Sequence, residues 1–452
     1  MIELLYLAAA VMFITGLKRL GHPRTARSGN TIASLGMLVA VVVTLVDTKI
    51  VTWGTVIAGL VVGGSIGAGV ARRVQMTSMP ELVAAFNGSG GAASALVALA
   101  EMIRIGPDTV AVEAGIATAL SVAIGTVTLS GSLVAYGKLA GLLPGRPMGF
   151  DGTNALNGAI TVAAVAVAGW AIASGSIAAW WLLAGITLVL GVLAVLPIGG
   201  ADMPVVISLL NSFSGMAAAA TGFVIANSAL IIGGALVGAA GLILTFQMSE
   251  AMNRSLGNVL FSKFGGVAAG PAGDADAVNR ATTEDVAITL AYANSVIVVP
   301  GYGMAVAQAQ YALRDVADAL EARGVKVTYA IHPVAGRMPG HMNVLLAEAD
   351  IPYDQLLDLE QSNPRFHQTD VVIVVGANDV VNPSARDDAS SPIYGMPILD
   401  VDRSKTVVVI KRSLSPGFAG IDNPLFYLDN TLMLFADAKE ALESLTRSVV
   451  DA

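Results

Sequence analysis

The sequence contains no cysteine and has few charged residues. With no cysteine among 452 residues, disulfide bridges and cysteine-ligated metals are excluded. Only 13% of the residues are charged, about half of the ~25% typical of soluble proteins. We predict no metal site, because no metal-ligand spacing relates the four histidines, which are His22, His332, His341 and His367. The net charge of −8 argues against a general nucleic-acid partner.

Long apolar runs fill the first half of the chain. A membrane-spanning helix needs about 20 mostly apolar residues, and residues 1–250 contain about nine such runs. They predict a multi-pass α-helical membrane domain with helices at roughly 2–17, 31–47, 53–71, 82–103, 114–136, 157–174, 177–197, 203–225 and 229–249. Only "SGS" separates the sixth run from the seventh.

Glycine and alanine are frequent in these runs. The segments "GGSIGAG" (63–69) and "GGALVGAAG" (233–241) contain small residues four positions apart, a spacing that allows helix backbones to approach closely. We therefore predict that both segments pack against other helices. The alternative is that they are lipid-facing helices that happen to be rich in glycine.

The loops between the runs carry positive charge unequally. Cytoplasmic loops are enriched in Lys and Arg. Only Lys49 and Arg104 fall in one set of alternate loops, whereas the other set carries Lys18, Arg19, Arg24, Arg27, Arg72, Arg73, Lys138 and Arg146. This asymmetry predicts an N-terminus outside the cell and a cytoplasmic C-terminal domain.

Polar side chains inside the runs are candidates for a shared polar path, since burying them in hydrocarbon is costly. They are Asn87, Ser89, Ser130, Ser132, Asn211, Ser212 and Ser214. No Asp, Glu, Lys, Arg or His lies near the middle of any predicted span, and a proton carrier needs a group that changes its protonation state. If protons cross this domain, the chain supplies polar walls, and water or a second subunit supplies the titrating group. Hydrogen bonding between helices is the alternative role.

The rest of the chain resembles a linker and a soluble domain. Residues 251–285 are rich in Gly, Ala and Asp without periodicity, and 286–452 have an ordinary charge content. Alternating strands and helices predict a Rossmann-like α/β domain with a parallel sheet between helices. We expect strands at 295–299, 326–332, 370–376 and 405–411, and helices at 303–324 and 436–451.

The stretch "VVPGYGMAVAQAQ" (299–311) is typical of a nucleotide-binding turn. Its pattern is Gly301, Gly303 and Val306 in a GxGxxV spacing, with a strand before it and a helix after it, which is the context that a dinucleotide site requires. A tight strand-to-helix turn without a ligand is the alternative.

The type of dinucleotide is indicated by charge at the strand ends. A site for NAD carries an acid at the end of the second strand, but that end reads "YAIHPVAG", with Arg337 close by. Lys411, Arg412 and Ser413 follow a later strand, and an Arg fork with a Lys is suited to a phosphate monoester. The sequence therefore favours NADP(H), although adjacent basic residues can also be simply solvated.

Several motifs together resemble the beta subunit of proton-translocating NAD(P) transhydrogenase. They include "GGADMPVV", "LNSFSG", "EAMNRS", "PGYGMAVAQAQ", "HPVAGRMPGHMNVLLAEA", "VVGAND", "SPIYGMPILDV", "KRS" and "NPLF". The resemblance implies a membrane domain joined to an NADP(H)-binding domain, with hydride passing from NADH to NADP⁺ while protons move inward. It assigns catalytic roles to Asp379, Asn378 and Arg337, with Asp379 coupling protonation to cofactor binding. It also implies a proton path along Asn87, Ser132 and Asn211.

The resemblance also implies the residues that contact NADP(H). They are Gly301, Tyr302, Gly303, Ala305, Val306, Val334, Ala335, Gly336, Arg337, Met338, Pro339, Gly376, Ala377, Asn378, Asp379, Val380, Gly395, Met396, Lys411, Arg412, Ser413, Leu414, Ser415, Pro416, Gly417, Phe418, Asp437 and Ala438. We expect Arg337, Asp379 and residues 411–418 to form a lid over the cofactor.

The implied partner is an alpha component that binds NAD(H), in a complex that is a homodimer in a bacterial inner membrane. Two positions depart from the family pattern: Asn87 stands where some relatives have histidine, and Phe418 replaces a tyrosine. A separate small membrane subunit would fit the first departure. The rival functions are a secondary transporter or a channel that is regulated by a nucleotide and performs no hydride chemistry.

Overall fold

The computed structural model divides into two compact units. One comprises Met1–Phe246 and Leu260–Lys263, and the other Gln247–Val259 and Phe264–Ala452. The structure describes residues 2–21, 23–47, 53–75, 78–106, 111–145, 147–252, 255–261, 278–338, 340–417 and 419–451.

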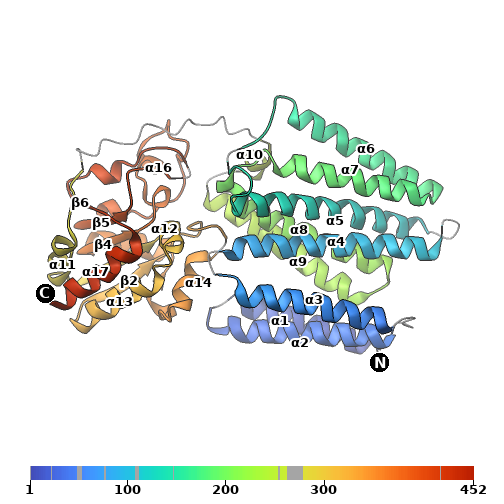
Figure 1. Cartoon of the computed structure of the whole chain (residues 1–452), viewed down its shortest axis with the longest axis horizontal. Helices are drawn as coiled ribbons and strands as arrows, with labels where there is room; N and C mark the ends of the chain where they lie inside the picture. Colours follow the sequence, from blue (N-terminus) through green and yellow to red (C-terminus); the bar gives the residue numbers. More distant parts are fainter. Residues whose placement is uncertain are drawn as a thin grey trace. The chain divides into compact units, whose positions relative to one another are not determined.

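The first unit is built of long helices (Figure 1). All except α1 are long and apolar enough to cross a membrane by length and composition. The predicted multi-pass helical domain is therefore confirmed, and the span predicted at 2–17 forms a helix that is not among these eight. The predicted break at "SGS" is also confirmed, because α6 ends at Ser174 and Gly175 adopts a φ of +62°. The described helices are α1 (Ile2–Leu20), α2 (Pro23–Asp47), α3 (Trp53–Arg73), α4 (Met79–Ile105), α5 (Val112–Leu139), α6 (Thr153–Ser174), α7 (Ile177–Val195), α8 (Met203–Val224) and α9 (Ser228–Ala251).

Helices α8 and α5 are the most buried of the apolar helices, and α5 contacts α4, α7 and α8. Glycine permits a close approach of two backbones where α4 meets α5. A Cβ at Gly91 would lie 2.6 Å from the carbonyl oxygen of Gly125, and a Cβ at Gly125 would lie 2.5 Å from that of Gly91. The two backbones therefore touch where neither helix carries a side chain, as is common in membrane bundles.

The two glycine-rich segments behave differently. In the segment 233–241, a Cβ at Gly234 would lie 2.7 Å from the carbonyl oxygen of Gly215 on α8, so the predicted packing is confirmed. In the segment 63–69, a Cβ at Gly63 or Gly67 would meet no described atom within 4 Å, and α3 has no buried residue. The packing predicted for 63–69 is therefore wrong within the described part of this chain.

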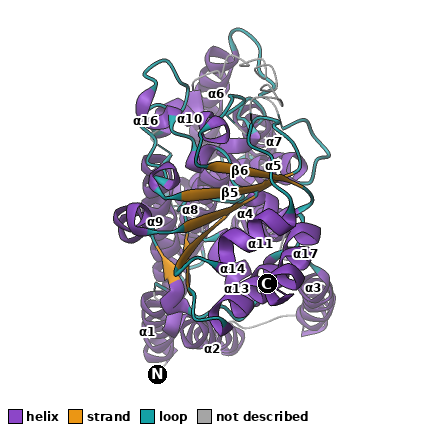
Figure 2. Ribbon diagram, turned by 90° about the vertical axis from the view of Figure 1, so that its left-hand side faces the viewer, coloured by secondary structure: helices purple, strands orange, loops and turns teal. Residues whose placement is uncertain are grey.

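The second unit contains a six-stranded parallel sheet (Figure 2). The strand order is β3-β2-β1-β4-β5-β6, the order of a doubly wound dinucleotide-binding fold. The predicted Rossmann-like sheet is thus confirmed. The strands are β1 (Ser295–Pro300), β2 (Lys326–Ala330), β3 (Leu356–Leu357), β4 (Val371–Val375), β5 (Thr406–Lys411) and β6 (Thr431–Phe435).

Both faces of the sheet are buried, which explains the uninterrupted runs of valine and isoleucine in its central strands. Helices α11 (Thr283–Ala291), α13 (Gln310–Ala322) and α17 (Ala438–Asp451) pack together on one side of the strands (Figure 2). Opposite them, Val299, Val374 and Val409 share a core with Phe366 and Phe426, which belong to short 3₁₀ turns.

Three features of the second unit differ from the sequence prediction. The helix predicted at 303–324 is two helices, α12 (Tyr302–Val306) and α13, because Gln308 adopts a φ of +51° between them. Strands β3 and β6 and helix α14 (His341–Glu348) had no predicted counterpart. Helix α11 begins inside the predicted linker, where Thr282 and Asp285 form a capping box that the sequence "TTED" encodes.

Candidate functional site

The candidate site lies at the carboxyl edge of the sheet. All strands are parallel, so the loops that follow them emerge at one edge, where ligands bind in open α/β sheets. Five of these loops contain most of the residues predicted to contact the cofactor, and they comprise residues 301–303, 331–338, 376–380, 411–417 and 436–438.

The glycine turn after β1 packs against the turn after β4. The Gly301 N–H donates to the Val375 carbonyl at 2.8 Å, and the Gly303 N–H donates to the Gly376 carbonyl at 2.9 Å. A Cβ at Gly301 would collide with Ala377, and one at Gly303 would lie 2.7 Å from the Gly376 Cα. Close contact between two turns is therefore sufficient to explain both glycines, with or without a ligand.

The loop after β2 folds back on the glycine turn. The Arg337 guanidinium lies 4.4 Å from the ring centroid of Tyr302, in cation–π geometry. The backbone N–H of Arg337 donates to Nδ1 of His341 at 3.0 Å. Gly336 has a φ of +111°, and a Cβ there would lie 2.5 Å from that of His341. The loop thus holds Arg337 against Tyr302 of the glycine turn, and its conformation requires glycine at position 336.

The loop after β5 covers Asp379. The Ala419 N–H donates to Oδ2 of Asp379 at 3.0 Å, and a Cβ at Gly417 would collide with the Asp379 carboxylate. When the Asn378 amide takes the orientation that satisfies its neighbours, its oxygen accepts from the Gly417 N–H at 2.7 Å and from Lys411 Nζ at 3.0 Å. Asn378 and Asp379 therefore both contact the loop that follows β5.

The basic cluster at the end of β5 is divided between two environments. Lys411 Nζ donates to the Ser415 carbonyl at 2.5 Å and lies 4.8 Å from the ring centroid of Phe426. Burial lowers the pKa of Lys411 to about 8, although the carboxylates of Asp379 and Asp422 oppose this shift. Arg412 and Ser413, in contrast, are exposed. The Lys411 ammonium thus lies under its own loop, while Arg412 lies at the surface.

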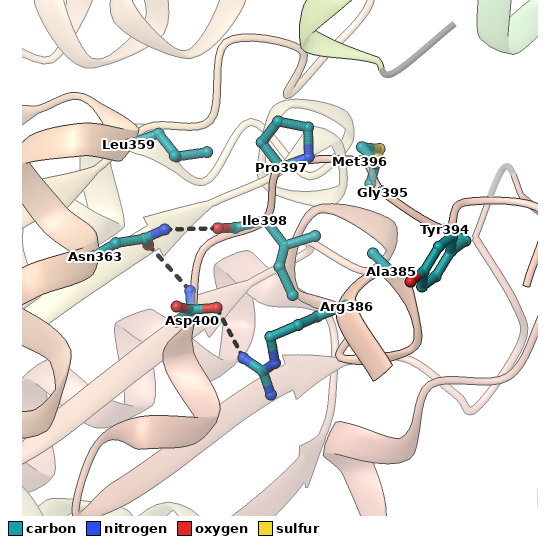
Figure 3. Close-up of a pocket in the computed structure, with 10 residues that line it drawn as sticks. All are labelled: Leu359, Asn363, Ala385, Arg386, Tyr394, Gly395, Met396, Pro397, Ile398 and Asp400. Atoms are coloured by element: carbon teal, nitrogen blue, oxygen red, sulfur yellow. Dashed lines mark hydrogen bonds and ion pairs between the residues drawn. The ribbon is translucent and has the colours of Figure 1, made fainter. Parts of the chain in front are cut away.

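A pocket of 350 Å³ lies beside the segment 394–398 (Figure 3). This volume is at the lower end of the ~300–1,000 Å³ usual for small-molecule sites. Its lining includes the predicted contact residues Gly395 and Met396. Asn363 shapes one wall, because its amide donates to the Ile398 carbonyl at 2.9 Å and accepts from the Asp400 N–H at 3.1 Å.

The remaining predicted contact residues are distributed along the same loops. Asp437 accepts from the Lys439 N–H at 3.0 Å, next to the first residue of α17, Ala438. Pro339 and Phe418 lie outside the described residues. The others differ in exposure: Ala305, Ala335 and Leu414 are buried, Val334, Met338, Val380 and Pro416 are partly buried, and Val306 and Ser415 are exposed.

The polar residues of the membrane unit form a hydrogen-bonded cluster. The buried Asn87 amide donates to the Ser132 hydroxyl at 3.0 Å and accepts from the Ser214 hydroxyl at 2.6 Å. The cluster therefore joins α4, α5 and α8. Asn211 is exposed in this chain, and the structure does not bring it into the cluster.

Ser214 is absent from the predicted proton path. It lies three residues after Asn211 on α8. The two side chains therefore lie on the same side of the helix but point in different directions around its axis. The sequence "NSFSG" places Asn211, Ser212 and Ser214 within one helical turn. Helical periodicity alone does not decide which of them is turned toward Asn87.

The whole chain is similar to a known protein family. The family model described as NAD(P) transhydrogenase beta subunit matches residues 2–448. Two curated relatives, both named NAD(P) transhydrogenase subunit beta, come from Rhodospirillum rubrum and from a strain of that species. Each is 48% identical to this chain over 457 residues, covering 98% of the chain and 98% of the relative. The similarity thus spans the membrane helices and the sheet domain.

Proposed function

Because the chain belongs to the family of NAD(P) transhydrogenase beta subunits, we propose that it binds NADP(H) and couples hydride transfer from NADH to inward proton movement. In this proposal residues 1–250 form the proton-translocating domain, 251–285 the linker and 286–452 the NADP(H)-binding domain. The chain is a membrane transhydrogenase component, and the assignments that follow are the finer parts of the proposal.

The observation that carries the proposal is the charge at the carboxyl edge of the sheet. Arg412 and Ser413 are exposed at the end of β5, and β2 is followed by His332 rather than an acid. A guanidinium recognises a phosphate through two parallel hydrogen bonds. We assign the 2′-phosphate of NADP(H) to Arg412 and Ser413, with Lys411 stabilising the loop beneath them.

The lid of the proposal is the loop 411–418 together with Asp379 and Arg337. Asp379 accepts a backbone hydrogen bond from Ala419, and its charge interacts with Lys411. Protonation of Asp379 would weaken both interactions, so the loop would release the nucleotide more readily. This is the link through which a proton bound by the protein changes NADP(H) affinity.

The proposed proton path passes Asn87, Ser132 and Asn211. The hydrogen bonds of Asn87 to Ser132 and Ser214 support placing Asn87 in this path. Because Ser214 bonds Asn87 directly, we add Ser214 to the path. None of these side chains titrates near neutral pH. Water or a partner subunit therefore has to carry the proton between them.

The partner in this proposal is an alpha component that binds NAD(H), because the relatives are named as beta subunits. A separate small membrane subunit and a homodimeric complex in a bacterial inner membrane complete it. The positive charges of the loops support a cytoplasmic position for the sheet domain. A proton moving down a potential of 100 mV releases ~2.3 kcal/mol, which the complex would use to favour NADPH formation.

Reconstituted vesicles test this function. With the alpha component added, NADH should reduce an NADP⁺ analogue while the pH changes across the membrane, and the chain alone should be inactive. Solute flux without hydride transfer would instead support a transporter, and conductance without turnover would support a channel.

A further inference from the structure

His332 is a buried side chain that the proposed function leaves unused. It lies two residues beyond the end of β2 and is 1% exposed. Its Nδ1 accepts from the Val334 N–H at 3.3 Å, and its Nε2 lies 2.7 Å from the Pro397 carbonyl oxygen. A carbonyl oxygen can only accept, so the imidazole is neutral and carries its proton on Nε2.

The two partners of His332 belong to different loops of the candidate site. Val334 lies in the loop whose residue Arg337 contacts the glycine turn. Pro397 lines the pocket next to Gly395 and Met396 (Figure 3). A single imidazole therefore joins the loop after β2 to the wall of the pocket across 65 residues of sequence.

The surroundings of His332 maintain its neutral form. Burial lowers the pKa of His332 to about 4, although the hydrogen bond to the Pro397 carbonyl opposes this shift. His341, at the other end of the same loop, also accepts a backbone N–H at Nδ1, and burial together with the charge of Arg337 lowers its pKa to about 4. The loop is thus folded around two neutral imidazoles.

We propose that His332 is a positioning residue that sets the distance between residues 334–338 and the pocket segment 395–398, and thereby the affinity of the crevice for NADP(H). This inference rests on the proposed function, in which both segments contact NADP(H). The side chain supplies an acceptor at the Nδ1 position and a donor at the Nε2 position, and only the donor joins the loop after β2 to the pocket segment. Asn and Gln each preserve one of them.

Two variants separate these properties in the full chain reconstituted with the alpha component. His332→Gln retains a donor that can reach the Pro397 carbonyl, whereas His332→Asn retains only the acceptor for the Val334 N–H. We expect His332→Asn to raise the NADPH dissociation constant about tenfold, because it leaves a buried carbonyl unpaired. His332→Gln should remain within about threefold of the unchanged protein.

The control is His367→Asn, since His367 is exposed and should leave NADPH binding unchanged. The turnover rate at saturating NADPH should change less than about twofold in each variant, because positioning acts on binding. A general loss of structure would lower binding and turnover together in both variants, and would therefore overturn the inference.

Equal losses in His332→Gln and His332→Asn, or no loss in either, would also overturn it. If His332→Asn does not fold, His332→Gln decides alone: near-normal NADPH binding supports the inference and a tenfold loss overturns it. Failure of the proposed function has its own signature: the unchanged protein would then bind NADPH no better than NADH.

Discussion

At the residue scale, our proposal assigns the phosphate-binding charge at the carboxyl edge to Arg412. Its neighbour Lys411 donates to the Ser415 carbonyl and is shielded by the ring of Phe426. Arg412 is exposed directly beyond the strand. The guanidinium can therefore meet a phosphate without first breaking an interaction within the loop.

Replacing Arg412 by Ala should weaken the binding of NADP(H) far more than that of its 2′-dephospho analogue. A hydrogen bond to a charged group contributes ~1.5–3 kcal/mol, so the NADPH dissociation constant should rise roughly 10- to 100-fold. Nucleotide fluorescence titration of the full chain measures it. Arg447→Ala, on the exposed face of α17, is the matched control. Equal losses for NADPH and the dephospho analogue would refute the phosphate assignment.

Sequence alone identified the residue types at the edge but not their orientation. Lys411 and Arg412 are adjacent in the chain, yet successive side chains of a strand point to opposite sides, and the returning loop covers only Lys411. His332 begins the motif "HPVAGRMPGHMNVLLAEA", but the sequence assigned it no role of its own, because its contact partner Pro397 is distant in sequence. Contacts between loops cannot be deduced from composition or periodicity.

At the element scale, the membrane helices were predictable and their packing was only partly so. Runs of about 20 apolar residues determine where a helix can span, and the observed helices match them. Glycine spacing predicted a close contact for α9 but also for α3, where none exists among the described residues. Small residues permit close approach, but a partner must be present to use it.

Substitutions at two glycines test whether close packing is present at α5 and absent at α3. Gly125→Ala should destabilise the membrane unit by ~1–3 kcal/mol, because its new methyl group would clash with the Gly91 carbonyl on α4. Gly63→Ala on α3 should have no such cost, since a Cβ there has nothing within 4 Å. Thermal unfolding in detergent, followed by tryptophan fluorescence, reports on this unit because all four tryptophans (Trp53, Trp170, Trp180 and Trp181) lie in it. Equal midpoints for the two variants would contradict the packing described for α4 and α5.

At the scale of the whole molecule, the proposed function depends on coupling between a membrane bundle and a nucleotide site. Two ligands are coupled when each changes the affinity of the other. In our proposal the ligands are a proton, for which Asn87 and its hydroxyl neighbours form the polar surroundings, and NADP(H) under the loop that covers Asp379.

Ser214→Ala tests the membrane side of this coupling. Without the Ser214 hydroxyl, the Asn87 amide loses its acceptor interaction, so NADP⁺ reduction driven by a proton gradient should fall about three- to tenfold, equivalent to ~0.6–1.4 kcal/mol. The control is Ser89→Ala, because Ser89 is exposed and bonds only the Ala85 carbonyl of its own helix. The assay is gradient-driven turnover in vesicles. Equal rates for the two variants would remove Ser214 from the proposed path.

The measurement that tests the central claim most directly is the nucleotide preference of the full chain. The account predicts that the chain without its partner binds NADPH at least about tenfold more tightly than NADH, because only NADPH offers a phosphate to the end of β5. Equal affinities, or a preference for NADH, would contradict it.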